Sequence, residues 1–547
     1  MQQQSLFLLD PDKELTITDV ALALNVSEAS VRNWVKAGYL VATERRFISR
    51  HSLDNFVQNI AGQEKLTHRA NKSHLDSHDH VVLSCAILEK LTEDEIGAIE
   101  LADYYETGLS NSYRNKEGIY YTSPGICREL LGALSTELVE KTFCDPCCGT
   151  GNFLIAAIEA GIRPDNVYGF DTDPVAVEIA RKRFAELVGY KSDNITCDDY
   201  LEFATRTPKG EVNYDVIITN PPWGKKLPKE KKREYGMLLR AGRSLDTSSL
   251  FLFASLSCLT PGGYIGFLLP EAFFNISQFQ DAREKLLENR LIALYDFGRP
   301  FPGLLTKARA FLMSADEPNA CTDVTCFVSG RKYRRKSEVF KHNPASIINM
   351  TCMPEDEDVI ERFFGTPHLT LHGQARWGLG IVTGNNKKFC KSEQVDGFMP
   401  VYKGSEVFPD RLAEPSSYIP RDTRLYQQVA PVELYEAPEK LIYRFISSNL
   451  IFYYDTNQSY ILNSANLIVL NANFPVSARK VAALFNMRIY NWIFQKLFET
   501  HKVLRSDIER LPVFDEFLKS RENPSEIELL EYLSIEETRD GTFRVKG

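Results

Sequence analysis

Four consecutive residues, Asn220-Pro221-Pro222-Trp223, carry groups that can bind a flat base through its exocyclic amine. They follow directly after 214–219, a short apolar run of the kind that forms a buried strand. The Asn220 amide and the Pro221 carbonyl can accept the hydrogens of an amine, and the Trp223 indole can stack on the ring that carries it. Enzymes that act on a base take it out of the stack and hold it in this way. A plain turn after a strand can also contain Asn-Pro-Pro, so the motif needs support from elsewhere in the chain.

A second group of residues, within 143–154, is typical of a loop that binds a nucleotide-like ligand. Asp145, Gly149 and Gly151 lie between a short strand-like start and a helical pattern over 153–160. Glycines allow the backbone to approach such a ligand closely. The spacing is not the G-x-G-x-x-G dinucleotide pattern. It is not the Walker pattern either, because no Lys-Ser/Thr pair follows the second glycine.

Two further acids follow predicted strands. Asp171 comes after the strand pattern at 166–170, and Asp199 comes after 194–197. An acid at the end of the second strand is well placed to accept hydrogen bonds from ribose hydroxyls, and the third carboxylate can bind an adenine amine. Strand and helix patterns alternate from 141 to 220, which predicts an α/β fold with a doubly wound parallel sheet. In such sheets ligands bind at the carboxyl ends of the strands, where these residues fall.

Together these motifs resemble those of a gamma-class DNA amino-methyltransferase that uses S-adenosyl-L-methionine. The resemblance covers roughly 101–314, and it implies a Rossmann-like methyltransferase core. In addition, 118–124 resembles the segment that closes over the methionine end of the cofactor, and 259–267 resembles the strand that follows the catalytic loop. The cofactor-binding residues that the resemblance implies are Tyr121, Thr122, Asp145, Pro146, Gly149, Gly151, Asp171 and Asp199.

Within that family, Asn rather than Ser at position 220 implies adenine N6 as the target rather than cytosine N4. Asn220 and the Pro221 carbonyl would hold the amine, Trp223 would stack on the flipped adenine, and the methyl group would move in line from the sulfonium. Positioning and electrostatics then carry most of the barrier. Phe301 falls where the family often places a second aromatic against the base; a packed loop residue is the alternative. The implied catalytic residues are Asn220, Pro221, Pro222 and Trp223.

Length and composition predict a large soluble enzyme with more than one domain. We expect a cytoplasmic protein without a membrane partner, because there is no apolar run long enough to span a bilayer and no signal peptide at the start. The 11 cysteines have no framework spacing, which favours free thiols. Cys144 and Cys147 have a ligand spacing, but no matching partner pair is found, so we expect no metal site.

The net charge of −9 does not exclude double-stranded DNA as the partner, because binding depends on the local distribution of charge. A basic cluster at 225–233, which includes Lys225 and Lys226, follows the catalytic tetrapeptide directly. We expect phosphate contacts or a mobile DNA-clamping loop there, with Gly224 and Gly236 as hinges. A solvated loop is the alternative.

The first 62 residues resemble the winged helix-turn-helix of MerR-type regulators. Helices are expected over 15–24, with Thr18 as N-cap, and over 27–38, with a wing at 39–48 and Val31 and Trp34 in the core. A protein-docking or dimerisation domain is the alternative. The residues expected to contact DNA are Ser30, Arg32, Asn33, Lys36, Arg45 and Arg46.

The rest of the chain is expected to hold three more parts. They are a linker and helical connection at 63–100, with a helix over 83–105, a methyltransferase domain at 101–330, and a mixed α+β target-recognition domain at 331–547. Within the last, strands are expected at 440–445 and 460–470, and a helix at 478–498. Lys403 and Arg444 are candidate base-edge or phosphate contacts there. A packed scaffold with aromatic core residues is the alternative.

These predictions converge on a sequence-specific DNA adenine-N6 methyltransferase, the modification enzyme of a restriction-modification system with a restriction endonuclease encoded nearby. No separate nuclease pattern is found in the chain. The alternatives are a modification subunit of a larger restriction or phage-exclusion complex, an enzyme that methylates RNA or protein glutamine, and a regulator that has lost catalysis. The long C-terminal region argues against the second, and the intact Asp145, Asp171 and Asn220 argue against the third.

Overall fold

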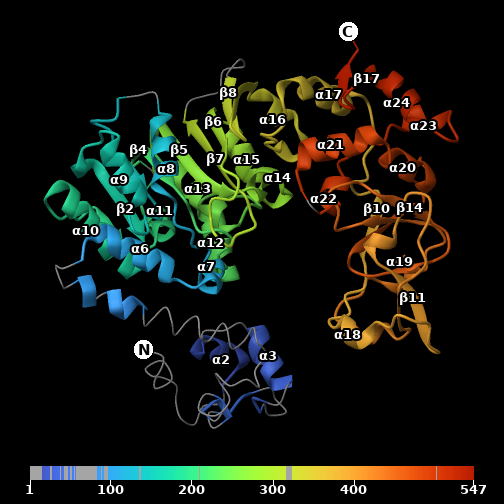
Figure 1. The fold of residues 1–547 in the computed structure, drawn as a ribbon, viewed down its shortest axis with the longest axis horizontal. Coiled ribbons are helices and arrows are strands. Elements are labelled where there is room, and N and C mark those ends of the chain that lie inside the picture. The colour runs from blue at the N-terminus through green and yellow to red at the C-terminus, as the bar shows by residue number, and fades with distance from the viewer. Residues whose placement is uncertain are drawn as a thin grey trace. The chain divides into compact units, whose positions relative to one another are not determined.

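The computed structural model divides by compactness into two units, which are described separately (Figure 1). Unit 1 comprises Met1–Ala241, Leu245–Leu269 and Arg299–Leu305, and unit 2 comprises Gly242–Ser244, Pro270–Gly298 and Thr306–Gly547. The residues that the structure describes are 15–24, 28–36, 39–41, 47–49, 52–54, 56, 83–87, 89–91, 96–134, 137–208, 210–315, 323–500 and 502–546. The predicted domain boundaries at 62, 100 and 330 rest on sequence patterns, whereas these units rest on compactness, so the boundaries stay predictions.

A parallel sheet forms the centre of unit 1. Its strand order is β3-β2-β1-β4-β5, and each neighbouring pair is parallel. The order reverses between β1 and β4, so the carboxyl ends of these two strands form the switch point where doubly wound sheets bind ligands. The strands are β1 (Phe143–Asp145), β2 (Val167–Asp171), β3 (Ile195–Cys197), β4 (Tyr214–Thr219) and β5 (Leu259–Pro270).

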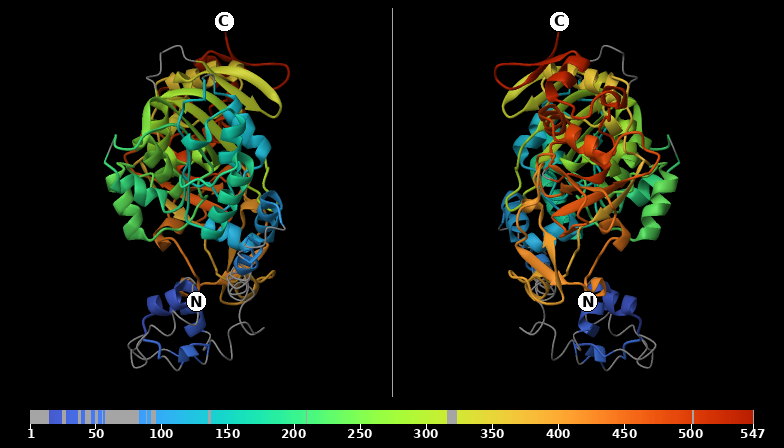
Figure 2. Two further views of the ribbon diagram at one scale, coloured as in Figure 1. Left: turned by 90° about the vertical axis from the view of Figure 1, so that its left-hand side faces the viewer. Right: turned by 90° about the vertical axis from the view of Figure 1, so that its right-hand side faces the viewer.

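Helices cover the faces of this sheet. Because crossovers between parallel strands are right-handed, the reversal at β1 puts the helices after β1 and β2 on one face and those after β3 and β4 on the other. The side views show the same unit with helices flanking its strands (Figure 2). Burial on both faces explains why β4 is an almost continuous apolar run. The covering helices are α9 (Asn152–Glu159), α10 (Pro174–Val188), α11 (Tyr200–Arg206) and α13 (Thr247–Ser257).

Four more helices of unit 1 border the sheet. The single helix predicted over 83–105 is wrong: Gly97 is extended (φ −65°, ψ 146°), and it separates α6 from the helical residues at 83–87 and 89–91. The Ser110 side chain caps α7, which ends at Gly118 with φ 73°. The helices are α6 (Ala98–Gly108), α7 (Asn111–Glu117), α8 (Pro124–Gly132) and α12 (Lys229–Leu238).

The N-terminal residues have a small core of their own, built on α2 (Ile17–Ala23) and α3 (Glu28–Lys36). Val31 and Trp34 are buried in it, as predicted. The prediction of Thr18 as N-cap is wrong. Thr16 caps α2 instead, because its Oγ1 accepts from Asp19 N at 3.1 Å while the Asp19 carboxylate accepts from Thr16 N. The predicted linker at 68–79 lies outside the described residues.

Unit 2 begins with four strands in the order β7-β6-β8-β9. The pair β6 and β8 is parallel, and the pairs β6–β7 and β8–β9 are antiparallel. The strands are β6 (Arg290–Asp296), β7 (Ala308–Ser314), β8 (Asp323–Val328) and β9 (Arg331–Lys336). The helices nearby in the chain are α14 (Ala272–Asn275), α15 (Gln280–Leu287), α16 (Glu338–His342) and α17 (Pro354–Gly365).

Two smaller sheets follow, with the orders β10-β16-β13-β14 and β12-β11-β15. The single strand predicted at 460–470 is wrong. A turn at Asn463 and Ser464 divides it, so that its two halves join different sheets. The strands are β10 (Ala375–Leu379), β11 (Phe398–Tyr402), β12 (Ser417–Pro420), β13 (Lys440–Arg444), β14 (Phe452–Asp455), β15 (Tyr460–Ile461) and β16 (Ala465–Leu470).

The helices of this C-terminal part pack mainly around one large apolar cluster. The helix predicted at 478–498 is two helices, because Met487 is extended (φ −65°, ψ 148°). Within the described ranges, no helix is both long enough and apolar enough to cross a membrane. The helices are α18 (Asn386–Phe389), α19 (Val432–Tyr435), α20 (Ala478–Phe485), α21 (Arg488–Phe498), α22 (Arg505–Ile508), α23 (Asp515–Lys519) and α24 (Glu526–Leu533), followed by strands β17 (Ile535–Glu537) and β18 (Phe543–Val545).

Candidate active site

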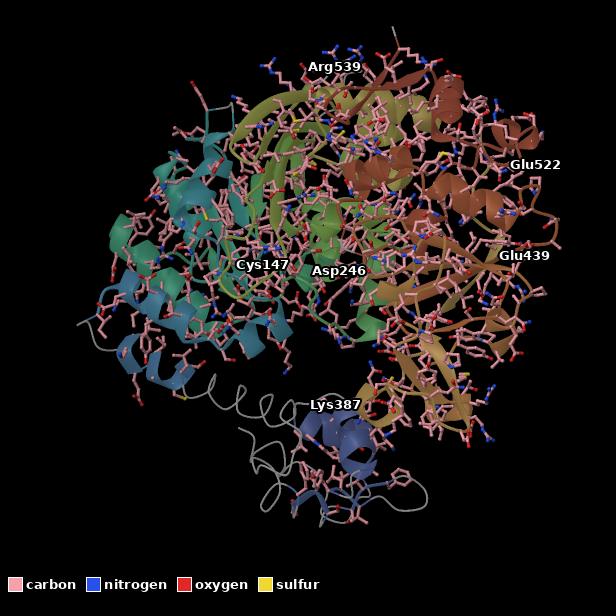
Figure 3. All side chains as sticks on the ribbon, turned by 45° about the vertical axis from the view of Figure 1, so that its right-hand side comes forward. Cys147, Asp246, Lys387, Glu439, Glu522 and Arg539 are labelled. Atoms are coloured by element: carbon pink, nitrogen blue, oxygen red, sulfur yellow. The ribbon has the colours of Figure 1, made fainter. Side chains whose placement is uncertain are left out.

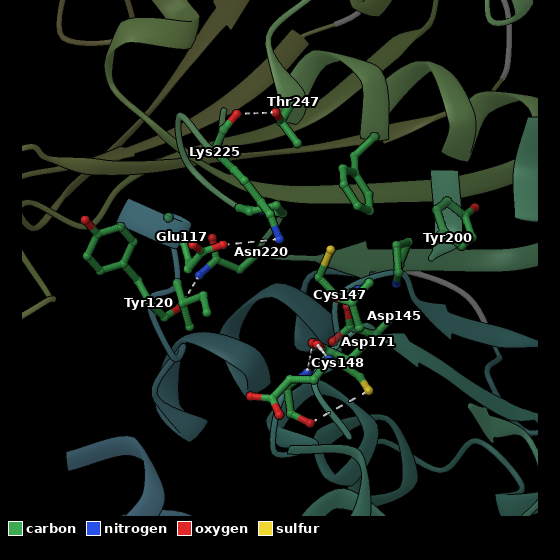
Figure 4. Close-up of a pocket in the computed structure, with 18 of the residues that line it drawn as sticks. Glu117, Tyr120, Asp145, Cys147, Cys148, Asp171, Tyr200, Asn220, Lys225 and Thr247 are labelled. Carbon is green, nitrogen blue, oxygen red and sulfur yellow. Dashed lines mark hydrogen bonds and ion pairs between the residues drawn. The ribbon is translucent and has the colours of Figure 1, made fainter. Parts of the chain in front are cut away.

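A cavity of about 310 Å³ lies at the switch point of the unit 1 sheet (Figure 4). All of its lining residues belong to unit 1. Most of the predicted catalytic and cofactor residues line it: Tyr121, Thr122, Asp145, Pro146, Gly149, Asp171, Asp199, Asn220 and Pro222. Four others, Gly151, Pro221, Trp223 and Phe301, are absent from this lining. The topology therefore brings together side chains that the sequence separates by about a hundred positions.

Carboxylates from three successive strands face this cavity. Asp145 ends β1; its Oδ1 accepts from Cys147 N at 3.0 Å, and its buried carboxylate also has the Thr219 side chain as a hydrogen-bonding neighbour. Asp171 ends β2 and accepts from the Gly149 and Asp173 amides. Burial raises the pKa of Asp145 to about 7 and that of Asp171 to about 6. Asp199 uses Oδ1 to cap α11.

Glycines form the loop between β1 and α9. Gly149 has φ 51°, and a Cβ there would lie 2.9 Å from the Tyr121 ring. Gly151 has φ 93° at the N-cap of α9, where a Cβ would approach Ala180 to 3.2 Å. Only glycine therefore fits both positions without strain. The result is a tight backbone cradle beside Asp145 and Asp171.

Asn220 lies just beyond the carboxyl end of β4. Its Nδ2 donates to the Tyr120 carbonyl at 2.6 Å, while its Oδ1 is buried with no donor among the described residues. The next contact along the same two segments joins Trp223 N to Gly118 O at 3.0 Å. A Cβ on Gly118 would lie 2.5 Å from the Trp223 carbonyl oxygen, so only glycine permits this approach. The segment before α8 thus fixes the rotamer of Asn220.

Three aromatic rings pack together beside Asn220. Trp223 and Phe301 are 8% and 7% exposed, and their ring centroids are 5.4 Å apart at 82°. The ring centroid of Tyr120 lies 5.3 Å from that of Trp223 and 5.4 Å from that of Phe301. Of the three residues, Tyr120 is the one that lines the cavity. Tyr120 is not among the predicted site residues, although it lies within 118–124. The Trp223 indole Nε1 donates to Leu268 O at 3.3 Å, which holds that ring in place.

Lys225 also lines the cavity, where its Nζ lies 3.6 Å from Glu117 Oε2. Lys225 was predicted to be part of a DNA-binding cluster, and Glu117 was not among the predicted site residues. No motif at 111–117 could have revealed Glu117, because its role depends on the approach of α7 to the catalytic loop. Among the described residues, no group of three or more His, Cys, Asp or Glu side chains is arranged to hold a metal ion.

Comparison with known proteins identifies the family. A helix-turn-helix domain model matches 14–60, an Eco57I restriction-modification methylase model matches 165–301, and a TaqI-like C-terminal specificity domain model matches 399–513. The Type II methyltransferase M.VspI of Vibrio sp. (strain 343) is 47% identical over 407 residues, which are 74% of this chain and 99% of that protein. The chain belongs to the type II methyltransferases of restriction-modification systems. It is a DNA methyltransferase.

Other relatives of this methyltransferase match parts of it. A tRNA1(Val) (adenine(37)-N6)-methyltransferase of a Flavobacteriaceae bacterium (strain 3519-10) is 36% identical over 104 residues, 19% of this chain and 42% of that protein. A nuclease-deletion mutant of the Type ISP restriction-modification enzyme LlaGI, solved with a DNA substrate mimic, has a TM-score of 0.51 at 11% identity, with 90% of this chain and 67% of that chain covered. This likeness concerns the fold, and with the family models it confirms the predicted α/β class.

The predicted DNA contacts at the N-terminus of the methyltransferase are only partly described. Arg32 is exposed on α3, where its guanidinium pairs with Glu28 at 2.6 Å. Three others, Ser30, Asn33 and Lys36, belong to the same helix, but their side chains lie outside the described part of the chain. Arg45 and Arg46 lie outside the described residues altogether. All six stay predictions.

The other predicted DNA contacts have different surroundings. Lys226 is exposed, unlike its neighbour Lys225. In unit 2, Lys403 Nζ donates to Ser416 Oγ at 2.8 Å, and Arg444 Nε donates to the Val407 carbonyl at 2.8 Å. Arg444 is therefore held by its own domain, which favours the scaffold alternative for that residue. The exposed side chains of unit 2 include Lys387 on α18, which projects from the surface (Figure 3).

Proposed function

We propose that this methyltransferase transfers the methyl group of S-adenosyl-L-methionine to N6 of an adenine in double-stranded DNA. The observation that carries the proposal is the buried Oδ1 of Asn220, which has no donor while Nδ2 is fixed to the Tyr120 carbonyl. An unsatisfied buried acceptor costs about 1–3 kcal/mol, so a ligand donor is expected to fill it. The exocyclic amine of a flipped base is such a donor. Adenine is the target implied by Asn at this position.

The reaction needs little more than positioning. Asn220 Oδ1 and the Pro221 carbonyl each accept one hydrogen of the amine, so the nitrogen lone pair is directed toward the methyl group. The cofactor would supply a methyl group on a sulfonium: as the N–C bond forms, the S–C bond breaks, the sulfur leaves as a neutral thioether, and the methylated amine releases one proton to solvent. A fixed acceptor costs no reorganisation when positive charge develops on the nitrogen, and such preorganised contacts stabilise transition states strongly. No covalent intermediate with the chain is required.

The cavity fits this cofactor. The raised pKa values of the buried acids Asp145 and Asp171 are those expected of carboxyl groups in a site that binds a cationic ligand. The cradle at Gly149 allows close backbone approach. We assign Asp171 to the ribose hydroxyls and Asp199 to the adenine amine of the cofactor. Tyr121, Thr122 and Pro146 line the same cavity and complete the assigned cofactor site, and Gly151 shapes its loop at the N-cap of α9.

We assign the target base to the aromatic cluster beside Asn220. Trp223 would stack on the flipped adenine, and Phe301 would support it from the side. In the described structure both rings are buried against Tyr120. Entry of a base would therefore require Tyr120 to shift, after which the Trp223 face would become available. Phe301 acts through its contact with Trp223 in this proposal.

The biological setting that we propose is modification within a restriction-modification system, with a cognate restriction endonuclease as a separate protein. Two matched domains support DNA as substrate: the helix-turn-helix model at 14–60 and the specificity-domain model at 399–513. The relative named Type II methyltransferase M.VspI is covered over 99% of its own length. That coverage favours a stand-alone enzyme over a subunit that needs partner chains.

Long-read sequencing of DNA from a host that expresses the chain tests the proposal. We expect one short sequence motif to carry N6-methyladenine at nearly every copy, and none in a host that expresses Asn220→Ala at the same level. Methylation of cytosine at the motif would overturn the adenine assignment. Activity of the purified chain on plasmid DNA would separate the stand-alone enzyme from a subunit of a larger complex.

RNA is a second candidate substrate, because three relatives are named tRNA1(Val) (adenine(37)-N6)-methyltransferases. They match at most 30% of this chain. The specificity-domain match at 399–513 favours DNA. Assays with total tRNA from a host lacking the tRNA enzyme would decide: methylation of tRNA at a rate comparable to that of DNA would establish the second function.

A further inference from the structure

We infer that Lys225 and Glu117 bind the amino-acid end of the cofactor, Lys225 its α-carboxylate and Glu117 its α-ammonium; the inference rests on the proposed cofactor. Lys225 is the sole cationic residue in the cavity lining that the structure describes. The same lining contains six acids, namely Glu117, Asp145, Asp171, Asp173, Asp198 and Asp199. S-adenosyl-L-methionine carries two cationic groups and one carboxylate. A mostly acidic cavity with a single cation is complementary to that distribution.

The two side chains already form an ion pair across the cavity. Lys225 Nζ lies 3.6 Å from Glu117 Oε2, and the side chains are 33% and 25% exposed (Figure 4). At this distance the pair makes no hydrogen bond, and such half-exposed pairs contribute little free energy. Breaking this ion pair to bind a zwitterionic ligand therefore costs little free energy. The ligand carboxylate replaces Glu117 beside Lys225, and the ligand ammonium replaces Lys225 beside Glu117. The Lys225 carbonyl accepts from Thr247 Oγ1 at 2.7 Å, so the backbone of Lys225 stays anchored.

The pair lies beside the catalytic loop, where the amino-acid group belongs, and Lys225 is near enough to Asp171 to act against the rise in its pKa. Asp171 and Asp199, at the other strand ends, are assigned to the nucleoside. The sulfonium must lie beside Asn220, since its methyl group passes to the amine held there. The amino-acid chain leaves from the same sulfur. Glu117 directly precedes Gly118, which contacts Trp223, so both members of the pair lie where the catalytic loop and 118–122 run side by side.

This assignment separates Lys225 from the basic cluster in which the sequence placed it. The next residue, Lys226, is exposed and does not line the cavity. It is therefore a matched control, with the same side chain one position away. A DNA phosphate is the other anion that Lys225 could bind, and the experiment must distinguish the two.

The test is calorimetric titration of the full-length chain with S-adenosyl-L-methionine and with its decarboxylated analogue. For each protein we compare the affinity for S-adenosyl-L-methionine with the affinity for the analogue, as a ratio. The attraction of an acidic cavity for cations affects both affinities, so it largely cancels in the ratio. We expect Lys225→Met to reduce that ratio by about tenfold, in the range expected for one charge-assisted contact. Lys225→Arg should retain most of it, and Lys226→Met all of it. Glu117→Gln should weaken binding of both ligands. It should not weaken binding of 5′-methylthioadenosine, which has neither the α-carboxylate nor the α-ammonium group.

An unchanged affinity ratio in Lys225→Met, with an unchanged melting temperature, would overturn the inference while leaving the proposed function intact. Loss of DNA affinity in Lys225→Met with unchanged cofactor affinities would assign the residue to phosphate and also overturn it. If the wild-type chain did not bind S-adenosyl-L-methionine at all, the proposed function would fall and the inference with it.

Discussion

Three buried charged side chains of unit 2 and the buried amide oxygen at the unit 1 cavity differ in how completely they are hydrogen-bonded. In unit 2, Lys440 and Asp455 are both fully buried and lie 2.6 Å apart. Arg283 is also fully buried and donates to four backbone carbonyls, those of Phe273, Ile276, Ala345 and Ser346. At the unit 1 cavity, by contrast, Asn220 Oδ1 is buried and has no donor among the described residues.

This contrast distinguishes buried groups that stabilise the fold from buried groups that are available to a ligand. A buried charge with all its partners holds elements together, and removing one partner leaves the other unpaired in a medium that solvates it poorly. A buried acceptor without a partner lowers stability in the free protein and gains a partner only when a ligand binds. Substitutions in the first class should change stability, and substitutions in the second should change chemistry.

The largest expected effect is on stability in unit 2. Lys440→Met should lower the free energy of unfolding by about 3–5 kcal/mol, because it leaves Asp455 buried and unpaired. Urea denaturation of the purified protein measures the change. The double variant Lys440→Met/Asp455→Leu should recover much of the loss. A loss below about 1 kcal/mol in the single variant would show that the pair is not structural.

Asn220→Ala should have the next largest effect, but on chemistry. We expect turnover to fall by about 10²–10³-fold, which corresponds to about 3–4 kcal/mol, because the acceptor for the target amine is lost. Cofactor affinity should stay close to wild type, and the melting temperature should fall only slightly, because the change removes one hydrogen bond, from Asn220 Nδ2 to the Tyr120 carbonyl. A variant that keeps more than a tenth of wild-type turnover would contradict the catalytic assignment.

Asp171→Ala should weaken binding of S-adenosyl-L-methionine by about 1.5–3 kcal/mol, the typical contribution of a hydrogen bond to a charged group. Binding to DNA should change far less. Calorimetric titration measures the first, and Asp193→Ala, which removes an exposed carboxylate, is the control. An unchanged dissociation constant would exclude Asp171 as the ribose ligand.

Cofactor affinity should also depend on pH. The pKa values of Asp145 and Asp171, about 7 and about 6, are raised by burial, and a cationic ligand favours the ionised forms. Binding should therefore release protons, and affinity should fall as pH drops through 7 toward 5.5, by up to about tenfold per pH unit for one group. Titration in two buffers of different ionisation enthalpy counts the protons. A flat profile would mean that the bound ligand does not favour the ionised form of either acid.

The parts of the site that the sequence predicts are those set by local patterns. The strand over 214–219 has the predicted bounds, and the helix predicted over 153–160 lies within one residue of α9 (Asn152–Glu159), because local apolar patterns form both. Since parallel strands share one carboxyl edge, the positions of Asp145, Asp171 and Asn220 near one another follow directly.

What the sequence could not predict depends on contacts between distant segments. Tyr120 and Glu117 join the site because the backbone at Gly118 touches the backbone at Trp223, which no periodicity encodes. Lys225 looked like one cation of a surface cluster, and only its place in the cavity lining distinguishes it from Lys226. Residues 460–470 were misread for a similar reason, since a short turn in an apolar run carries the chain from one sheet to another.

The smallest expected effect concerns the N-terminal residues, whose apolar core ends at Phe56 among the residues that the structure describes. Deletion of residues 1 to about 62 should leave methyl transfer intact, because the cavity lining begins at Tyr113. If Arg32, Lys36, Arg45 and Arg46 contact phosphates, the slope of log affinity for DNA against log salt should flatten by about one unit per lost contact. Filter binding at several salt concentrations measures that slope. A truncated protein that binds cofactor but cannot methylate its site would make the helix-turn-helix part of target recognition. An unchanged slope with unchanged activity would favour a docking domain instead, because a DNA-binding unit cannot be removed without releasing fewer counterions.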